Sequence, residues 1–270
     1  MSDSEKEEIR QAVRDKYGSV AQATNTGCGC STLSCCSPRD ISIALGYSLG
    51  QLAAAPEGAN MGLGCGNPHA IAALKEGETV LDLGSGGGFD CFLAARAVGE
   101  TGRVIGVDVT PEMVSKARQN AANVGFENIE FRLGEIENLP VADISVDVII
   151  SNCVINLSPE KPRVFKEALR VLKPGGRLAI SDVVATAQLP EEMKGDLALY
   201  TGCIAGASLI DDLERMLREA GFTYIRIQPK DESREFIRDW APGMRVEDFV
   251  VSATIEAVKP CCCSWSCWGG

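Results

Sequence analysis

The stretch that most constrains the fold runs from Val80 to Phe89 and has the sequence Val-Leu-Asp-Leu-Gly-Ser-Gly-Gly-Gly-Phe. It indicates a buried strand, a glycine-rich turn and the start of a helix. Glycine suits such a turn because it adopts positive φ without strain. Because it has no Cβ, backbone N–H groups can also approach an anionic ligand at the positive end of the helix. The stretch therefore predicts a site for a nucleotide-like cofactor.

From residue 79 onward, apolar strand patterns alternate with helical patterns, which is typical of a parallel sheet covered by helices. The sequence predicts five strands, near 79–83, 103–108, 128–133, 146–152 and 177–182. It predicts helices near 88–98, 111–124, 160–172, 191–201 and 208–220. Two further strands, near 222–228 and 247–257, have no strong helix between them and favour an antiparallel edge on the sheet.

The first 77 residues are less regular. Residues 4–17 have the pattern of an amphipathic helix, with Ser4 and Glu7 in capping-box spacing. Short helices are expected within 38–54 and 68–75, and His69, at a helix start, is expected on the surface.

The composition is acidic, with 37 Asp and Glu against 26 Lys and Arg and a net charge of −11. This disfavours a nucleic acid partner, because phosphate binding depends on Lys and Arg. The acidic, polar start does not resemble a secretory signal, and no apolar run approaches the roughly 20 residues of a membrane span. We expect a cytoplasmic protein with no nucleic acid or membrane partner. In that reducing compartment the 12 cysteines are not expected to form a static disulfide framework.

Other positions narrow the identity of the cofactor. The third glycine position of the dinucleotide pattern is Phe89, which is neither Gly nor Ala. Asp108 ends the second strand, where a carboxylate can accept both ribose hydroxyls of an adenosine, and Glu135 follows the third strand, where it offers adenine a polar edge. The strings Val-Leu-Asp-Leu-Gly-Ser-Gly-Gly-Gly, Gly-Val-Asp-Val-Thr-Pro-Glu-Met and Leu-Lys-Pro-Gly-Gly-Arg-Leu, within residues 79–183, resemble the class I S-adenosylmethionine-dependent methyltransferases.

This resemblance implies an α/β, Rossmann-like fold with a mostly parallel seven-stranded sheet and an antiparallel edge strand. It places the methionine carboxylate of the cofactor on the amides of the glycine turn, the ribose on Asp108 and the adenine near Met113. The cofactor-binding residues that it implies are Asp82, Gly84, Ser85, Gly86, Asp108, Met113, Gly134, Glu135, Ile136 and Asn152.

Cysteines outside the glycine turn point to the substrate. Cys65 lies in a turn flanked by glycines, Cys153 follows the fourth strand, and Cys203 follows a helix in a turn of small residues. Open α/β sheets bind ligands at the carboxyl ends of their strands, so Cys153 should face the methyl donor. Thiolates there suit a soft, thiophilic electrophile better than a proton-transfer reaction. Cys91, within a helical pattern, is expected to be a buried packing residue.

With these cysteines the chain resembles a narrower family, the arsenite S-adenosylmethionine methyltransferases. The resemblance covers about residues 28–257 and rests on the glycine-flanked Cys65, on Ser-Asn-Cys-Val-Ile-Asn-Leu at 151–157 and on Gly-Cys-Ile-Ala-Gly-Ala at 202–207. It implies that trivalent arsenic binds to Cys65, Cys153 and Cys203, and that Cys35 or Cys36 acts with them. It also implies arsenite or its thiol conjugates as substrate, and glutathione or thioredoxin as reductant. We expect a monomer.

On this basis we divide the chain into an N-terminal helix with cysteine-bearing loops (1–77), an S-adenosylmethionine-binding core (78–185), an arsenic-site segment with closing edge strands (186–259) and a cysteine-rich tail (260–270). The tail can capture arsenic, bind zinc or copper, or take no part in turnover. Two alternative functions stay open: a class I C-methyltransferase of quinone or sterol precursors, and a non-catalytic thiol protein that binds a metalloid. The number of methyl groups transferred and the activity on antimony do not follow from the sequence.

Overall fold

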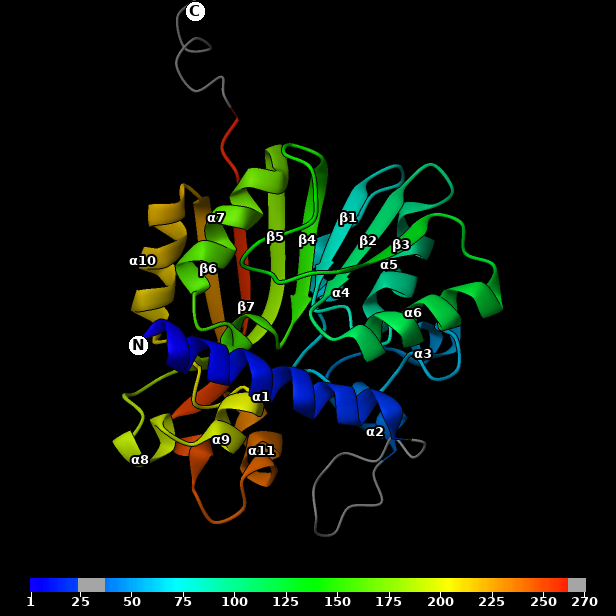
Figure 1. Cartoon of the computed structure of the whole chain (residues 1–270). Coiled ribbons are helices and arrows are strands. Elements are labelled where there is room, and N and C mark those ends of the chain that lie inside the picture. Colours follow the sequence, from blue (N-terminus) through cyan, green and yellow to red (C-terminus); the bar gives the residue numbers. More distant parts are fainter. Residues whose placement is uncertain (24–36, 262–270) are drawn as a thin grey trace, which may run out of the picture.

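The structure is a computed structural model of the chain, and it describes residues 1–23 and 37–261. At its centre lies a seven-stranded sheet in the order β3-β2-β1-β4-β5-β7-β6 (Figure 1). Its strands are β1 (Thr79–Leu83), β2 (Arg103–Asp108), β3 (Ile129–Leu133), β4 (Val146–Asn152), β5 (Leu172–Ala185), β6 (Thr223–Lys230) and β7 (Val250–Val258).

The sheet is mostly parallel, as predicted. Strands β1 to β5 pair in parallel, whereas β7 runs antiparallel to both of its neighbours, β5 and β6. The reversed strand therefore lies one position inside the edge that β6 forms. The chain first adds strands outward from β1 to β3 and then returns to place β4 on the other side of β1. Open α/β sheets bind ligands at such a reversal, beyond the carboxyl ends of the strands.

Helices cover both faces of this sheet (Figure 1). Alternate residues of a strand point to opposite faces, so β1 contributes Leu81 and Leu83 to one buried cluster, with α7 and α10, and Val80 to another, with α5 and α6. The helices are α1 (Asp3–Gln22), α2 (Pro38–Ala44), α3 (Leu49–Ala54), α4 (His69–Ala72), α5 (Phe89–Val98), α6 (Pro111–Val124), α7 (Lys161–Val171), α8 (Glu191–Lys194), α9 (Leu197–Thr201), α10 (Ile210–Ala220) and α11 (Arg234–Ile237). The 3₁₀ turns are η1 (Ile155–Leu157), η2 (Asp231–Ser233), η3 (Arg238–Trp240) and η4 (Val246–Asp248).

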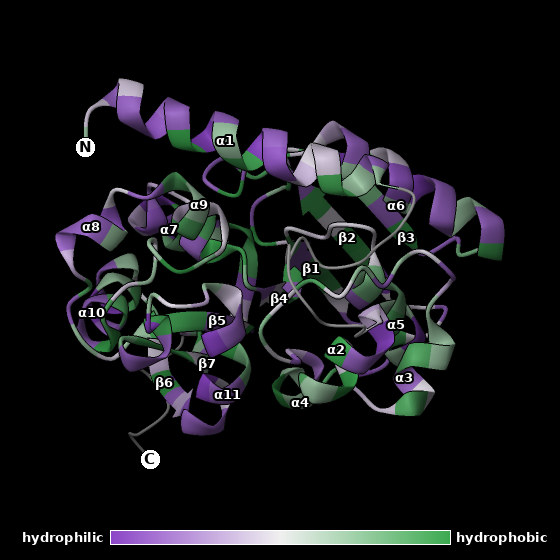
Figure 2. Cartoon of the chain, turned by 90° about the horizontal axis from the view of Figure 1, so that it is seen from below, coloured by the Kyte–Doolittle hydropathy of each residue, from purple (hydrophilic) through white to green (hydrophobic). Residues whose placement is uncertain are grey.

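Helix α1 lies across the end of the sheet where the parallel strands finish, and Figure 2 shows it spanning the molecule from α9 to α6. Its capping box is formed by Ser2 and Glu5. The prediction of a box at Ser4 and Glu7 is therefore wrong, because the same spacing occurs two residues earlier, where the helix begins. The helix expected at 191–201 is two short helices, α8 and α9, interrupted near Gly195.

Among the residues described, no helix combines the length and the apolar character that crossing a membrane requires.

Candidate active site at the carboxyl end of the sheet

The glycine turn joins β1 to α5, and its backbone needs glycine at several positions. Gly84, Gly86 and Gly88 have φ values of 72°, 50° and 91°. A Cβ on Gly84 would lie 2.3 Å from Val154 Cγ2, so the turn packs directly against the residue that follows Cys153. A Cβ on Gly86 would have no described atom within 4 Å, so this side of the turn is open to a ligand.

Polar groups that could hold a cofactor border the open side of the turn. One oxygen of the buried Asp108 carboxylate accepts a 2.9 Å hydrogen bond from the Gly86 N–H, and the other accepts one from the Thr110 N–H. Burial raises the pKa of Asp108. The buried Ser85 hydroxyl has no hydrogen-bond partner within the described part of the chain. An open glycine turn, a carboxylate beside it and an unpartnered hydroxyl fit the carboxylate and ribose of S-adenosylmethionine.

The other residues expected at the cofactor site have varied surroundings. Met113 of α6 packs with Met61 and with Ala21 of α1, and these side chains form an apolar contact between the two helices. The Gly134 N–H donates to the Asp108 carbonyl at 2.9 Å, which keeps the loop after β3 beside β2. Ile136 is buried in the main core cluster.

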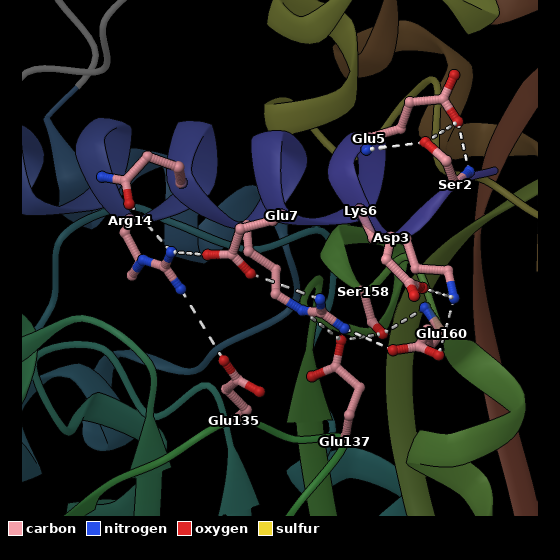
Figure 3. Close-up of polar contacts among 12 residues, drawn as sticks. Ser2, Asp3, Glu5, Lys6, Glu7, Arg14, Glu135, Glu137, Ser158 and Glu160 are labelled. Carbon is pink, nitrogen blue, oxygen red and sulfur yellow. Dashed lines mark hydrogen bonds and ion pairs between the residues drawn. The ribbon is translucent and has the colours of Figure 1, made fainter.

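Two acidic side chains expected at this site make other contacts. The side chain of Glu135 is 42% exposed, and it lies 3.9 Å from a guanidinium nitrogen of Arg14 (Figure 3). Asp82 is buried and accepts a 3.3 Å hydrogen bond from the Cys91 thiol. Cys91 is buried, as expected, and this bond gives its thiol a polar partner as well.

The fold brings Cys65, Cys153 and Cys203 together in one buried cluster beneath α1. Their residues are 2%, 8% and 4% exposed, respectively. The Sγ atoms of Cys65 and Cys153 and one carboxylate oxygen of Asp182 lie within 4.8 Å of one another. The Cys203 thiol donates a 2.9 Å hydrogen bond to the Cys153 carbonyl. The Cys65 and Cys153 thiols therefore lie near each other, and Cys203 lies in the same buried cluster with its thiol directed at the Cys153 backbone.

The backbone at two of these cysteines is strained. Cys153 has a φ of 61° and Cys203 a φ of 65°, values that favour glycine and cost other residues of order 1–3 kcal/mol each. Such strain persists only where the surroundings impose it, and it concentrates at functional sites. Asp182 supplies part of that constraint, because its carboxylate accepts hydrogen bonds from the N–H groups of Ile155 and Val183 and from the Asn156 amide.

The thiols of Cys65 and Cys153 lie in surroundings that keep them protonated. Burial raises the pKa of Cys65. Hydrogen bonding with the Cys203 and Cys65 thiols, together with burial, raises the pKa of Cys153 well above its ordinary range. Burial also raises the pKa of Asp182 to about 6. At neutral pH the cluster therefore presents neutral thiols of Cys65 and Cys153 beside a buried carboxyl group.

Several site residues escaped the sequence reasoning or were placed differently by it. Asp182 and Asn156 support the cysteine cluster. The polar Ser-Asp pair that interrupts the apolar run of β5 was a usable signal for Asp182. The prediction that His69 lies on the surface is wrong, because its side chain is only 8% exposed and Nε2 lies 3.3 Å from the Asp90 carboxylate.

The side chain of Asn152, which the sequence assigned to the cofactor site, hydrogen-bonds to the turn that carries Cys65. Cys35 and Cys36 fall outside the described residues.

Known proteins are similar to this chain over most of its length. A family model described as a methyltransferase domain matches residues 74–221. The chain is 56% identical to an arsenite methyltransferase of Halobacterium salinarum, over 96% of this chain and 69% of that protein. It is 42% identical to an arsenite methyltransferase of Aquipseudomonas alcaligenes, over 81% of this chain and 63% of that protein. The chain thus spans about two thirds of the length of these curated relatives.

A solved structure extends this similarity to three dimensions. The arsenic(III) S-adenosylmethionine methyltransferase of Chlamydomonas reinhardtii superimposes with a TM-score of 0.60 and 35% sequence identity. The match covers 82% of this chain and 73% of that chain.

Proposed function

The chain belongs to the family of S-adenosylmethionine-dependent arsenite methyltransferases, and we propose that it transfers a methyl group to trivalent arsenic bound by Cys65, Cys153 and Cys203. The observation that carries the proposal is the convergence of three buried cysteines next to the glycine turn. Val154 links the two, because it follows Cys153 in the chain and packs against Gly84. The thiols are thereby held close to the place where a cofactor would lie.

Neutral thiols suit the binding of arsenite. Arsenous acid, As(OH)₃, is itself neutral, and each thiol that replaces a hydroxide gives its proton to that hydroxide, which leaves as water. Three replacements yield a neutral arsenic tris-thiolate and three waters. A complex without net charge avoids the large penalty of burying an ion, so the dry cluster can accept it. The arsenic atom keeps its lone pair.

The chain's residues would hold the cofactor by complementary contacts. The open side of the turn at residues 86–87 would lie against the methionine carboxylate, Asp108 would accept from the ribose hydroxyls, and Met113 would line the purine site. The other N–H groups of the turn donate within the protein, those of Gly84 and Ser85 to the Val107 carbonyl and that of Gly88 to the Ser85 carbonyl. S-adenosylmethionine, when bound, supplies an electrophilic methyl group. The protein's part is to orient the arsenic lone pair toward that group and to exclude water. Tyr17 of α1 contributes to both sites, because it packs against the cysteine cluster and against the Met113 cluster.

A thiol reductant belongs to the same proposal. Transfer of the methyl group to the lone pair would release S-adenosylhomocysteine and formally oxidise arsenic from +3 to +5, as a methylarsenic cation bound by three thiolates. Two of these thiolates would then leave arsenic as a disulfide, which returns two electrons to arsenic, and a water would take their place with loss of one proton. Glutathione or thioredoxin would reduce the disulfide by thiol exchange. Cys35 or Cys36 would serve as a resolving thiol. We place this chemistry in the cytoplasm, where thiols are kept reduced.

The test is methyl transfer from labelled S-adenosylmethionine to arsenite in the presence of reduced thiol. Cys153→Ser and Cys203→Ser should each lower the rate by about 100-fold or more, because a hydroxyl cannot replace a thiolate ligand to arsenic. Both should keep the affinity for S-adenosylmethionine. Cys261→Ser, an exposed cysteine at the opposite end of the sheet, is the matched control. Normal rates in both site variants would overturn the proposal, and arsenite binding without methyl transfer would favour a binding protein.

A further inference from the structure

Two side chains hold the turn that carries Cys65: Asn152, at the end of β4, and Ser252 of β7, whose hydroxyl donates a 2.7 Å hydrogen bond to the Cys65 carbonyl. Asn152 makes the larger number of these contacts. The Asn152 Oδ1 atom accepts a 3.0 Å hydrogen bond from the Cys65 N–H, and Nδ2 donates a 2.8 Å bond to the Gly66 carbonyl. A Cβ on Gly64 would lie 2.7 Å from the same amide, so the turn packs directly on it. One side chain therefore holds the backbone on both sides of the Cys65 side chain.

These contacts demand an asparagine. The Cys65 N–H can only donate and the Gly66 carbonyl can only accept, so the side chain needs one acceptor and one donor at fixed positions. The second proton of Nδ2 goes to the Tyr47 hydroxyl at 3.0 Å, and that hydroxyl donates to Asp90 at 2.7 Å. An aspartate in this position would lack the donor and would place negative charge against the Gly66 carbonyl.

The other two cysteines are held by a separate set of contacts. The Asn156 amide donates to the Asp182 carboxylate at 3.0 Å and to the Val183 carbonyl, and it reaches the Cys203 carbonyl at 3.5 Å. The Cys203 thiol also donates directly to the Cys153 carbonyl. None of these bonds passes through Asn152, so Cys153 and Cys203 should keep their arrangement when the amide of Asn152 is removed.

We propose that Asn152 is a positioning residue that presents Cys65 as the third thiol to arsenic and so sets the preference for arsenicals with three exchangeable positions. The inference rests on the proposed function, because it takes the three cysteines as the arsenic ligands. It differs from the role that the sequence suggested for Asn152, which was to contact the cofactor. Residues that orient a metal ligand without touching the metal typically change affinity by 10–100-fold when they are replaced.

Two arsenicals distinguish binding by three thiols from binding by two. Arsenite has three exchangeable positions, whereas phenylarsine oxide has two and can be held by Cys153 and Cys203 alone. In the full chain, Asn152→Ala should weaken arsenite binding by about 10-fold or more and leave the affinities for phenylarsine oxide and S-adenosylmethionine within about twofold. Asn152→Asp should behave in the same way. Asn128→Ala is the matched control, because its amide also bonds to a backbone carbonyl, that of Gly99 before β2.

Each result decides a different point. Unchanged arsenite affinity in both Asn152 variants, with Cys65→Ser weakened, would overturn the inference and leave the proposed function standing. Equal weakening for arsenite and phenylarsine oxide would show a general structural role and would also overturn it. A loss confined to S-adenosylmethionine would return Asn152 to the cofactor site. Unchanged arsenite affinity in Cys65→Ser itself would instead contradict the proposed three-thiol site.

Discussion

Cys153 and Cys203 both occupy the left-handed region of backbone conformation, and each is held there by its neighbours. The turn that carries Cys203 packs so closely on the segment after Cys153 that a Cβ on Gly206 would lie 2.1 Å from the Asn156 carbonyl oxygen. This contact leaves no room for a side chain. The strained geometry of the thiol site thus depends on a glycine that carries no chemistry itself.

Gly206→Ala should therefore lower the free energy of unfolding by about 1–3 kcal/mol, because the extra methyl group forces two packed segments apart. Gly202→Ala, in the same turn, is the control, since its Cβ would lie 3.3 Å from the nearest atom and its φ is negative. Chemical denaturation measures both variants. Equal losses would contradict the role given to the Gly206 contact.

At the scale of the element, helix α1 is held over the site by its basic side chains. Lys6 and Arg10 lie 3.1 Å and 2.6 Å from the Glu160 carboxylate, which precedes α7. Arg14 pairs with Glu7 within the helix and faces Glu135 (Figure 3). Because α1 also carries Tyr17 between the cysteine and Met113 clusters, release of the helix would open both sites to water.

Acid should loosen this helix. Hydrogen bonds from Lys6 and Arg10 hold the pKa of Glu160 below its ordinary value of 4.5. A lowered carboxyl pKa stabilises the fold at pH above 4.5, and that stabilisation is lost as the pH falls through the pKa in the folded state. Amide hydrogen exchange, corrected for its intrinsic pH dependence, should show lower protection of α1 below about pH 4 than at pH 6. In Arg10→Met the difference should shrink, and equal protection of α1 at the two pH values would contradict the expectation.

The strands and most helices were predictable because their hydrophobic patterns are local. The alternation from residue 79 onward placed the strands close to their observed bounds, and the glycine turn and Asp108 identified one end of the sheet as the cofactor side. The start of α1 was not predictable from spacing alone, since Ser2 with Glu5 and Ser4 with Glu7 offer the same pattern. Local sequence determines an element and its approximate ends. Two possible N-caps close together differ little in free energy, so spacing alone does not choose between them.

Local sequence patterns could not predict which residues support the thiol site. The sequence singled out Cys65, Cys153 and Cys203, but the bond from the Cys65 N–H to Asn152 joins residues 87 positions apart. Asn156 and Asp182 meet in the same way, through the pairing of β4 with β5. Which way such a side chain points depends on the packing of distant segments. The prediction that His69 lies on the surface was wrong for the same reason.

At the scale of the whole molecule, the sheet separates the cysteine cluster from Cys261. The cluster of Cys65, Cys153 and Cys203 lies at the end of the sheet where β7 begins, at Val250. Strand β7 then runs its full length away from the cluster, about 30 Å for nine residues. Beyond its end, the Sγ atom of Cys261 lies 3.2 Å from the Cβ position of Gly175, at the opposite end of the sheet. The tail therefore begins far from the proposed arsenic site.

Deletion of residues 261–270 should consequently leave the arsenite affinity and the rate at limiting arsenite within about twofold, because none of the described ligands or their supports is removed. Calorimetry and initial rates of the shortened chain measure this. A tenfold fall of the rate at limiting arsenite, with a normal rate at saturation, would show instead that the tail captures the substrate.

The ligand set of arsenic is measured most directly by X-ray absorption at the arsenic edge of the arsenite complex. We predict three sulfur ligands and no oxygen in the wild-type chain, and two sulfurs with one oxygen in Cys65→Ser. Arsenic bound by a single sulfur, or by oxygen alone, would contradict the proposal that Cys65, Cys153 and Cys203 hold the substrate.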